Sequence, residues 1–285
     1  MLTCQDVLDI RGSEARMAFA PATRSNEVAP HDGPGGYGGH MDTRIAVITG
    51  AGSGIGRAVA RTLIARGWHA AALGRRRDRL EETLDGAPGC LAIEADIAAP
   101  EAVRAAFAQV AGTYGRLDVL FNNAGMFGPA DDVGAADWNE VAQTIDVNAT
   151  GAFYCASAAF DLMRERGGRI INNGSISAQV PRPHSVAYAM SKHAVAGLTK
   201  AIIIDGRPHR ITATQVDIGN AATEILSAIG TGDGALQPDG SRRAEPSFDP
   251  EIAGRMIADI AGLPLEATVD QLTLTASGMP FPGRG

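Results

Sequence analysis

The chain has 285 residues, 45% of them hydrophobic and 20% charged, which is the composition of a folded globular protein and excludes disorder throughout. Its net charge of −7 supplies no positive field for nucleic acid or for an anionic membrane, so neither is an expected partner. Its longest apolar runs fall far short of the ~20 residues that span a bilayer, so no membrane segment is expected.

Residues 1–41 differ in character from the rest of the chain. The stretch 21–40 is rich in glycine, proline and polar residues and has no sustained apolar period. A secretory signal would need a run of ~7–15 apolar residues after a basic start, and residues 1–40 contain no such run. The sequence therefore predicts a disordered tail over 1–41 and one domain over 42–285, with Met41 as its natural beginning. We expect deletion of residues 1–40 to change fold and activity little.

From residue 43 onward, short apolar runs alternate with segments of helical spacing. Strands are expected at 45–48, 68–73, 91–95, 119–121, 169–172, 211–216 and 269–275. Helices are expected at 57–66, 77–84, 100–114, 137–163, 186–204 and 249–261. This alternation predicts a parallel sheet covered by helices on both faces. Such sheets bind ligands at the carboxyl ends of their strands, near the point where the strand order reverses.

A glycine-rich segment follows the first expected strand and opens the first expected helix. It reads Thr49-Gly50-Ala51-Gly52-Ser53-Gly54-Ile55-Gly56. Glycines let the backbone turn sharply and approach a pyrophosphate, whose charge meets the free N–H groups at the helix start. A tight turn alone would also explain a glycine cluster. The strand before it and the helix after it favour dinucleotide binding.

The spacing of these glycines resembles the short-chain dehydrogenase/reductase family, whose signature is T-G-x3-G-x-G. Other motifs of that family follow in order: Asp96, Asn122-Asn123-Ala124-Gly125, Asn148, Ser175 and Tyr188-x3-Lys192. Taken singly, several of these residues would be ordinary caps or turn residues, and their joint order carries the resemblance. It covers residues 41 to about 275 and implies a doubly wound Rossmann fold, α/β in class, with a parallel seven-stranded sheet in a single domain.

The resemblance implies an NAD(P)-dependent oxidoreductase that interconverts a carbonyl and an alcohol. It implies these roles: Tyr188 as general acid and base, Ser175 as donor to the substrate oxygen, Lys192 as partner of Tyr188 and of the cofactor ribose, and Asn148 as anchor of a proton-relaying water. At ~4 Å and an effective dielectric of ~20, the Lys192 ammonium would stabilise the Tyr188 phenolate by roughly 4 kcal/mol. That would lower the tyrosine pKa by about three units.

The expected cofactor-binding residues lie in the same strand-end segments. They are Gly50, Ser53, Gly54, Ile55, Gly56, Arg75, Asp96, Ile97, Asn123, Ala124, Gly125, Tyr188, Lys192, Gly219 and Thr223. No metal site is expected. The end of the second strand lacks the acidic residue that would bond the ribose 2′-hydroxyl of NAD, and Arg75 can pair with a 2′-phosphate. This pattern favours NADP over NAD, although a merely solvated Arg75 would leave the same pattern.

The segment after the sixth strand departs from the family pattern. Ile218 stands where the family usually has the proline of a Pro-Gly pair, while Gly219 and Thr223 fit the pattern. Asp217 is unusual at its position, and we expect it to take part in a buried network or a cap rather than contact substrate. The segment 224–248 is predicted to be a mobile substrate loop. Its sequence varies with substrate across the family, so the substrate itself is not predicted.

Two other functions stay open on the sequence: a catalytically silent dinucleotide-binding sensor or scaffold, and an isomerase that uses bound nicotinamide. The complete set of four expected catalytic residues argues against the first. The expected partner is a small carbonyl or alcohol substrate. By resemblance the chain forms a homodimer or homotetramer through the helices around Asn148 and after Tyr188. Three widely spaced cysteines, Cys4, Cys90 and Cys155, suit no disulfide framework and favour the cytoplasm.

Overall fold

Seven strands form one sheet in the order β3-β2-β1-β4-β5-β6-β9, and every neighbouring pair is parallel. The computed structural model describes residues 43–223, 234–237, 239–279 and 281. The strand order reverses between β1 and β4, which is the doubly wound arrangement of a Rossmann fold. The predicted fold class is confirmed, and the predicted tail lies outside the described residues.

The strands are β1 (Ile45–Thr49), β2 (His69–Gly74), β3 (Leu91–Glu94), β4 (Val119–Asn122), β5 (Gly168–Asn173), β6 (Ile211–Ile218) and β9 (Gln271–Leu274). The helices are α1 (Gly54–Ala65), α2 (Arg77–Leu84), α3 (Pro100–Tyr114), α4 (Trp138–Ile145), α5 (Gly151–Met163), α6 (Val186–Gly206) and α8 (Pro250–Gly262). Helices α2 and α3 begin and end at the predicted residues. Within the described residues, no helix is long and apolar enough to cross a membrane.

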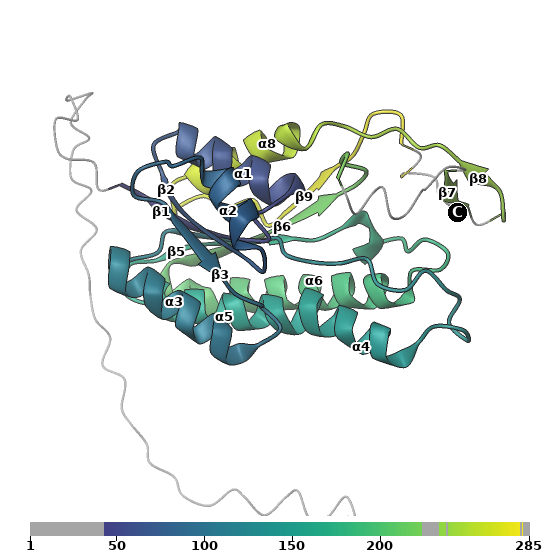
Figure 1. Cartoon of the computed structure of the whole chain (residues 1–285), viewed down its shortest axis with the longest axis horizontal. Helices are drawn as coiled ribbons and strands as arrows, with labels where there is room; N and C mark the ends of the chain where they lie inside the picture. The colour runs from purple at the N-terminus through teal and green to yellow at the C-terminus, as the bar shows by residue number, and fades with distance from the viewer. Residues whose placement is uncertain (1–42, 224–233, 238, 280, 282–285) are drawn as a thin grey trace, which may run out of the picture. The chain divides into compact units, whose positions relative to one another are not determined.

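Two layers of helices cover the sheet, with α1, α2 and α8 on one face and α3, α5 and α6 on the other (Figure 1). All five residues of β1 are buried. Ala46 and Ile48 pack into the core beneath α1 and α8, whereas Ile45 and Val47 pack into the core beneath α3 and α5, because successive strand side chains point to opposite faces. A strand buried on both sides reads as a continuous apolar run, which is why the sequence reveals it.

The predicted helix over 137–163 is interrupted in the structure. Asp137 caps α4 by accepting hydrogen bonds from two backbone N–H groups of the first turn. A π-helical turn, Asp146–Thr150, then joins α4 to α5. Such a turn inserts one residue without ending the helix, so the apolar period hardly registers it. The turn carries Asn148, which is buried.

The structure describes only part of the predicted mobile loop over 224–248. Residues 224–233 and 238 lie outside the described residues. The described remainder contains a short antiparallel hairpin, in which β7 (Ala235–Leu236) pairs with β8 (Arg242–Arg243). Farther along, Phe248 forms an isolated parallel bridge with Ala221. Two-residue strands are too short to produce a periodic pattern, so the sequence gives no sign of them.

Candidate active site

Two adjoining hollows lie at the carboxyl ends of the strands. The larger groove, with an empty volume of about 1330 Å³, runs past the ends of β1, β2, β3 and β4. The smaller pocket, of about 600 Å³, adjoins the ends of β5 and β6. Tyr188 and Thr223 line both hollows. Tyr188 therefore faces the junction between a long groove and a compact pocket.

Most of the expected cofactor residues line the larger groove. These are Gly50, Ser53, Gly54, Ile55, Arg75, Asp96, Ile97, Asn123, Ala124, Gly125, Tyr188, Lys192 and Thr223. Gly219 lines the smaller pocket instead. Gly56 lines neither hollow, because it packs beneath the glycine-rich turn. Among the described residues, no group of His, Cys, Asp or Glu side chains is arranged to hold a metal ion.

The start of α1 fits an anionic group such as a pyrophosphate. Gly50 and Gly54 have φ values of +65° and +50°, which bring the turn close to the groove. Ser53 occupies the N-cap position, but its side chain makes no capping hydrogen bond, and the first turn carries no acidic residue. The backbone N–H groups and the positive end of the helix dipole are therefore available to a negative charge in the groove.

Gly56 packs so closely that no side chain fits there. A Cβ at this position would lie 2.3 Å from the carbonyl oxygen of Gly50. We expect Gly56→Ala to reduce the free energy of unfolding by about 1–3 kcal/mol through overpacking and to weaken dinucleotide binding by displacing the turn. Thermal denaturation and dinucleotide titration would measure both. Gly112→Ala is the matched control, because a Cβ at this exposed α3 position meets nothing within 4 Å. Equal behaviour of the two variants would contradict the packing role.

Asn123, which follows β4, is hydrogen-bonded to the glycine-rich turn after β1. Its side-chain Nδ2 donates to the carbonyl oxygens of Thr49, at 3.0 Å, and Gly50, at 3.3 Å. The hydroxyl of Thr49 in turn accepts from the backbone N–H groups of Asn123 and Ala124. Asn173 donates to Asn123 Oδ1 at 2.9 Å. These bonds tie the ends of β1, β4 and β5 together and fix the floor of the larger groove.

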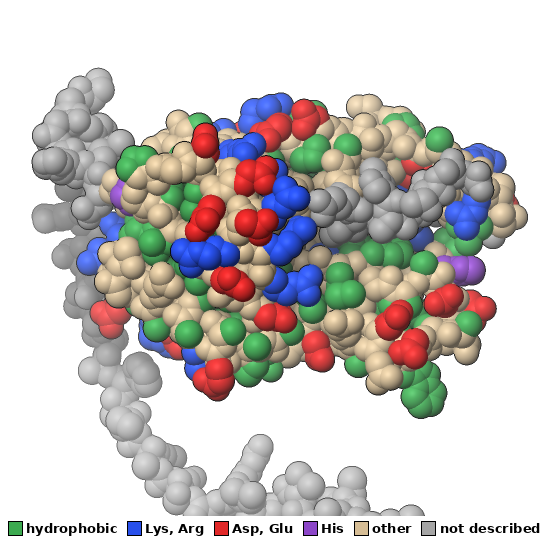
Figure 2. Space-filling view, in the orientation of Figure 1, with side chains coloured by type: hydrophobic (Ala, Val, Ile, Leu, Met, Phe, Trp, Pro, Cys, Tyr) green, Lys and Arg blue, Asp and Glu red, His purple; other side chains and the backbone are tan. Residues whose placement is uncertain are grey.

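Basic side chains lie at the far end of the larger groove. Arg75 and Arg76 follow β2, are exposed and line the groove. Figure 2 shows Lys and Arg side chains gathered around α2 on this face. Asp96 and Ile97 follow β3 and form the opposite wall. Asp96 Oδ1 accepts from the backbone N–H of Ala98 at 3.0 Å, so the aspartate also shapes its own turn.

The structure brings Ser175, Tyr188 and Lys192 together. Ser175 follows β5 and lines the smaller pocket together with Tyr188. Tyr188 and Lys192 lie one turn apart on α6, with the Lys192 Nζ 5.5 Å from the centroid of the tyrosine ring. Phe127 packs against that ring, with centroids 5.1 Å apart. The tyrosine is therefore held between a hydroxyl group, an aromatic side chain and an ammonium group.

The pKa values of this pair run against the expectation from sequence. Burial raises the pKa of Tyr188, and the lowering influence of the nearby Ser175 hydroxyl does not compensate. Burial also lowers the pKa of Lys192, to about 8. The Lys192 Nζ donates to the carbonyl oxygen of Asn173 at 2.7 Å rather than facing the phenol oxygen. The expected lowering of the Tyr188 pKa by Lys192 is therefore not produced by the protein's own groups.

Asn148 is held by backbone groups of the segment after β4. Its Oδ1 accepts from the N–H of Met126, and its Nδ2 donates to the carbonyl oxygen of the same residue, both at 2.8 Å. The Nδ2 also donates to the Ser191 hydroxyl at 3.0 Å. The π-helical turn thus positions Asn148 between the wall of the larger groove and α6.

Asp217 forms a buried network behind Ser175, in agreement with the role expected for it. It is fully buried, and its carboxylate accepts from the Ser175 backbone N–H at 3.0 Å. It also accepts from three glutamine side chains, Gln179, Gln215 and Gln271, at 2.7 to 2.8 Å. Four N–H donors thus satisfy the hydrogen-bonding capacity of this buried carboxylate. Its charge raises the pKa of both Tyr188 and Lys192.

Several site residues were not predicted from the sequence. The walls include Met126, Phe127, Asn173, Arg182 and Asn220. Asn173 could have been found, because it ends an expected strand just before Ser175. Arg182 lies between Ser175 and Tyr188 in the sequence, but no pattern there distinguishes a wall of the pocket from an exposed turn. Ile218, which replaces a family proline, is buried and lines the smaller pocket.

Comparison with known proteins gives a consistent result. Residues 44–233 match the family described as short chain dehydrogenase. The chain is 37% identical to a 3beta-hydroxysteroid dehydrogenase of Mediterraneibacter gnavus over 62% of this chain and 66% of that protein. It is 32% identical to a 2,5-dichloro-2,5-cyclohexadiene-1,4-diol dehydrogenase of Sphingobium indicum over 78% of this chain and 92% of that protein.

Solved structures show the same architecture. A serine dehydrogenase complexed with NADP+ superposes with a TM-score of 0.73 at 26% identity, over 81% of this chain and 94% of that one. Actinorhodin polyketide ketoreductase with NADPH superposes with a TM-score of 0.71 at 26% identity, over 82% of this chain and 96% of that one.

Proposed function

The chain belongs to the short-chain dehydrogenase family and is an NAD(P)-dependent oxidoreductase acting on alcohol and carbonyl groups; on this premise we propose that Asn148, Ser175, Tyr188 and Lys192 carry its chemistry within the domain 42–285. The observation that carries the proposal is the position of Tyr188. It lies at the junction of the two hollows, in the same pocket as Ser175 and one helical turn from Lys192.

Tyr188 is the proton donor and acceptor in the proposed mechanism. When bound, the nicotinamide supplies a hydride to the carbonyl carbon, or removes one from the alcohol carbon. The Tyr188 hydroxyl gives its proton to the substrate oxygen during reduction and takes one back during oxidation. The Ser175 hydroxyl donates a hydrogen bond to the same oxygen and stabilises the charge that develops there. Lys192 binds the ribose hydroxyls, and Asn148 anchors a water molecule that passes protons to solvent.

A raised Tyr188 pKa suits the reduction direction near neutral pH. The phenol is then protonated and ready to donate, while oxidation requires the phenolate and gains rate as the pH rises. The pKa of about 8 on Lys192 means that the ammonium is present at neutral pH. Absorbance of the reduced nicotinamide, followed with a panel of ketones and alcohols, tests the proposed function. No absorbance change with any substrate would contradict it.

We propose NADP as the preferred cofactor. Arg75 lines the larger groove where the adenosine ribose would lie, and both structural relatives described above were solved with NADP+ or NADPH. We expect kcat/KM with NADPH to exceed that with NADH, and Arg75→Ser to reduce the NADPH value by roughly tenfold while changing the NADH value little. Arg104→Ser, at an exposed position on α3, is the control. Equal efficiency of the wild-type protein with both cofactors would contradict the preference.

The relatives give no support to a catalytically silent sensor or scaffold, because they are named dehydrogenases and reductases. A nicotinamide-dependent isomerase would convert substrate without net change in reduced nicotinamide. The absorbance assay therefore separates that alternative from the proposed function.

We propose that the chain assembles as a homodimer or homotetramer through α4, α5 and α6. Large apolar side chains are exposed on these helices: Trp138, Phe153, Met190 and Ile204. Exposed apolar patches of this kind mark association surfaces. Light scattering of the purified protein would test the assembly. We also propose a cytoplasmic location, which the unpaired state of Cys90 and Cys155 supports and cell fractionation tests.

A further inference from the structure

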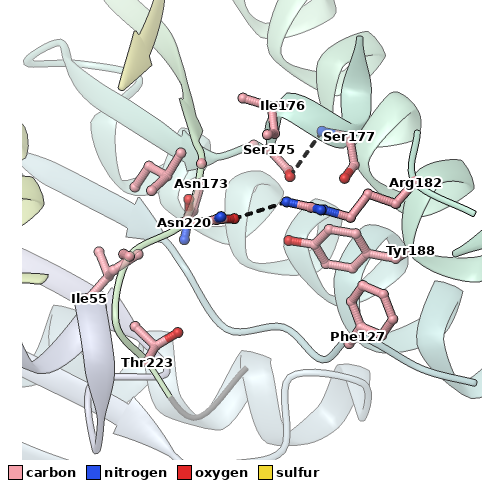
Figure 3. A pocket seen from close by; sticks show the side chains of 14 residues that line it. Ile55, Phe127, Asn173, Ser175, Ile176, Ser177, Arg182, Tyr188, Asn220 and Thr223 are labelled. Atoms are coloured by element: carbon pink, nitrogen blue, oxygen red, sulfur yellow. Dashed lines mark hydrogen bonds between the residues drawn. The ribbon is translucent and has the colours of Figure 1, made fainter. Parts of the chain in front are cut away.

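Both apolar and polar side chains line the smaller pocket. Phe127, Ile176 and Ile218 contribute apolar groups, while Arg182 and Asn220 contribute polar groups. Figure 3 shows the Arg182 side chain extending between Ser175 and Tyr188, with its guanidinium group directed toward Asn220. A guanidinium therefore lies next to the hydroxyl groups that would hold the reacting oxygen.

Buried partners fix this guanidinium. Arg182 donates from Nη1 and Nη2 to the two carboxylate oxygens of Glu245, at 2.9 and 2.5 Å, and from Nη2 to Asn220 Oδ1 at 3.0 Å. The side chains of Arg182 and Glu245 are only 8% and 4% exposed. Asn220 and Gln237 also donate to Glu245, at 2.8 and 3.1 Å. The guanidinium is thus preorganised before any substrate enters.

The charge of Arg182 is balanced by Glu245. Burial raises the pKa of Glu245, but hydrogen bonds from Arg182, Asn220 and Gln237 together hold it at about 2. Glu245 is therefore a carboxylate at any working pH, and the pair is neutral as a whole. A substrate carboxylate at this position would have to compete with Glu245 for the same guanidinium and would be repelled by it. The pair therefore disfavours anionic substrates.

Two of the five N–H donors of Arg182 remain. Three are bonded to Glu245 and Asn220, whereas Nε and the second N–H of Nη1 have no partner among the residues that the structure describes. Nε is not among the fully buried polar atoms, so a molecule in the pocket can reach it. A substrate that displaces water from the pocket must supply an oxygen acceptor, since leaving the N–H unpaired is unfavourable. An uncharged hydroxyl or carbonyl oxygen on the substrate meets that need without disturbing Glu245.

Resting on the proposed function, we propose that Arg182 determines specificity by binding a second, uncharged oxygen of the substrate. The substrate class is then a small neutral hydroxy-ketone and the corresponding diol, rather than a plain ketone or a keto-acid. The reacting oxygen lies at Tyr188 and Ser175, and the second oxygen lies at Arg182. The apolar side chains of the pocket contact the carbon skeleton between them.

Matched ketones test this assignment. Cyclohexanone is compared with 2-, 3- and 4-hydroxycyclohexanone and with 4-oxocyclohexanecarboxylate, each with saturating cofactor. We expect the wild-type protein to prefer the best hydroxy-ketone over cyclohexanone by about 10- to 100-fold in kcat/KM, and to use the keto-acid poorly. Arg182→Met should bring the hydroxy-ketone and cyclohexanone within a few-fold of each other. Cofactor affinity should stay unchanged, because Arg182 does not line the larger groove.

Arg182→Met leaves the buried Glu245 carboxylate without its cationic partner, which could prevent folding. Two further variants test the assignment in that case. The double variant Arg182→Met with Glu245→Leu removes both charges and should lose the same preference. Glu245→Gln frees the guanidinium charge and should raise kcat/KM for the keto-acid by about tenfold relative to the other ketones. Arg104→Met, exposed on α3, is the control and should match the wild-type protein.

The outcomes separate this inference from the proposed function. Equal turnover of cyclohexanone and all hydroxy-ketones by the wild-type protein, or a preference for the keto-acid, overturns the role of Arg182 and leaves the oxidoreductase function standing. A hydroxy-ketone preference that survives in the Arg182 variants also overturns it. Reduction of none of these ketones by protein with bound cofactor overturns the hydroxy-ketone assignment, while the broader panel of ketones and alcohols tests the oxidoreductase function separately.

Discussion

Replacing Tyr188 with phenylalanine should lower turnover by roughly 10²–10⁴ while leaving dinucleotide affinity within a few-fold of the wild-type value. The substitution removes only the hydroxyl group, which shares the smaller pocket with the Ser175 side chain. The ring contact with Phe127, at 5.1 Å, can persist. Proton transfer is lost, whereas the groove that binds the dinucleotide keeps its shape. Dinucleotide titration and steady-state kinetics on the same preparation measure the two effects separately.

A control substitution distinguishes proton transfer from packing. Phe127→Leu disturbs the ring contact on the other side of Tyr188 and leaves the hydroxyl group in place. We expect it to reduce turnover by much less than Tyr188→Phe. Near-normal turnover of Tyr188→Phe on a good substrate would show that another group transfers the proton.

Replacing Lys192 with methionine should weaken dinucleotide binding and reduce turnover by roughly 10² or more, yet stabilise the folded protein at neutral pH. The ammonium group lines the larger groove beside Tyr188, so its loss removes a positive charge and, with it, the proposed contact to the cofactor ribose. The same group is buried, and burial lowers its pKa from 10.5 to about 8. The buried ammonium therefore lowers the stability of the folded protein, and its proposed functional role explains why it is kept.

The size of this stabilisation depends on pH in a defined direction. A fall in pKa from 10.5 to about 8 corresponds to about 3 kcal/mol of destabilisation by the charged form. Loss of the hydrogen bond to the Asn173 carbonyl offsets about 1 kcal/mol of the gain. Between pH 8 and 10.5 the unfolded state binds more protons, so wild-type stability rises with pH there. The advantage of Lys192→Met should be full below about pH 8 and disappear before pH 10.5, because the lost hydrogen bond outweighs what remains of the pKa effect there.

Thermal unfolding of both proteins across this pH range tests the prediction. Lys200→Met, at an exposed position on the same helix, is the control and should show no such pH-dependent gain. A Lys192→Met variant that is less stable than the wild-type protein at neutral pH would contradict the account of the buried ammonium.

Most of the fold is predictable because the sheet is parallel and buried on both faces. Each strand appears as an apolar run, and each helix as a 3.6-residue period. Candidate residues placed after separate strands, such as Gly50, Asn123 and Ser175, come together because the carboxyl ends of parallel strands share one edge. The π-helical turn at Asn148 was not predicted, since a single inserted residue barely alters the helical period.

The buried polar networks could not be predicted for a different reason. Gln179, Gln215 and Gln271 meet Asp217 from three separate segments. Likewise, Arg182 and Glu245 are 63 positions apart in the chain. A polar residue that is buried with a partner looks, in the sequence, like one that is solvated. The predicted lowering of the Tyr188 pKa was wrong for the same reason. The spacing reveals the nearby Lys192 ammonium but not the burial of the phenol, which raises the pKa by more.

The most direct test of the central claim is the pH dependence of kcat/KM for alcohol oxidation, measured side by side for the wild-type protein and Tyr188→Phe. If Tyr188 accepts the proton, the wild-type value should rise about tenfold per pH unit until the tyrosine is ionised. The Tyr188→Phe value should be roughly 10²–10⁴ lower and independent of pH over the same range. A rising limb of the same slope and position in Tyr188→Phe would contradict the assignment of Tyr188 as the proton acceptor.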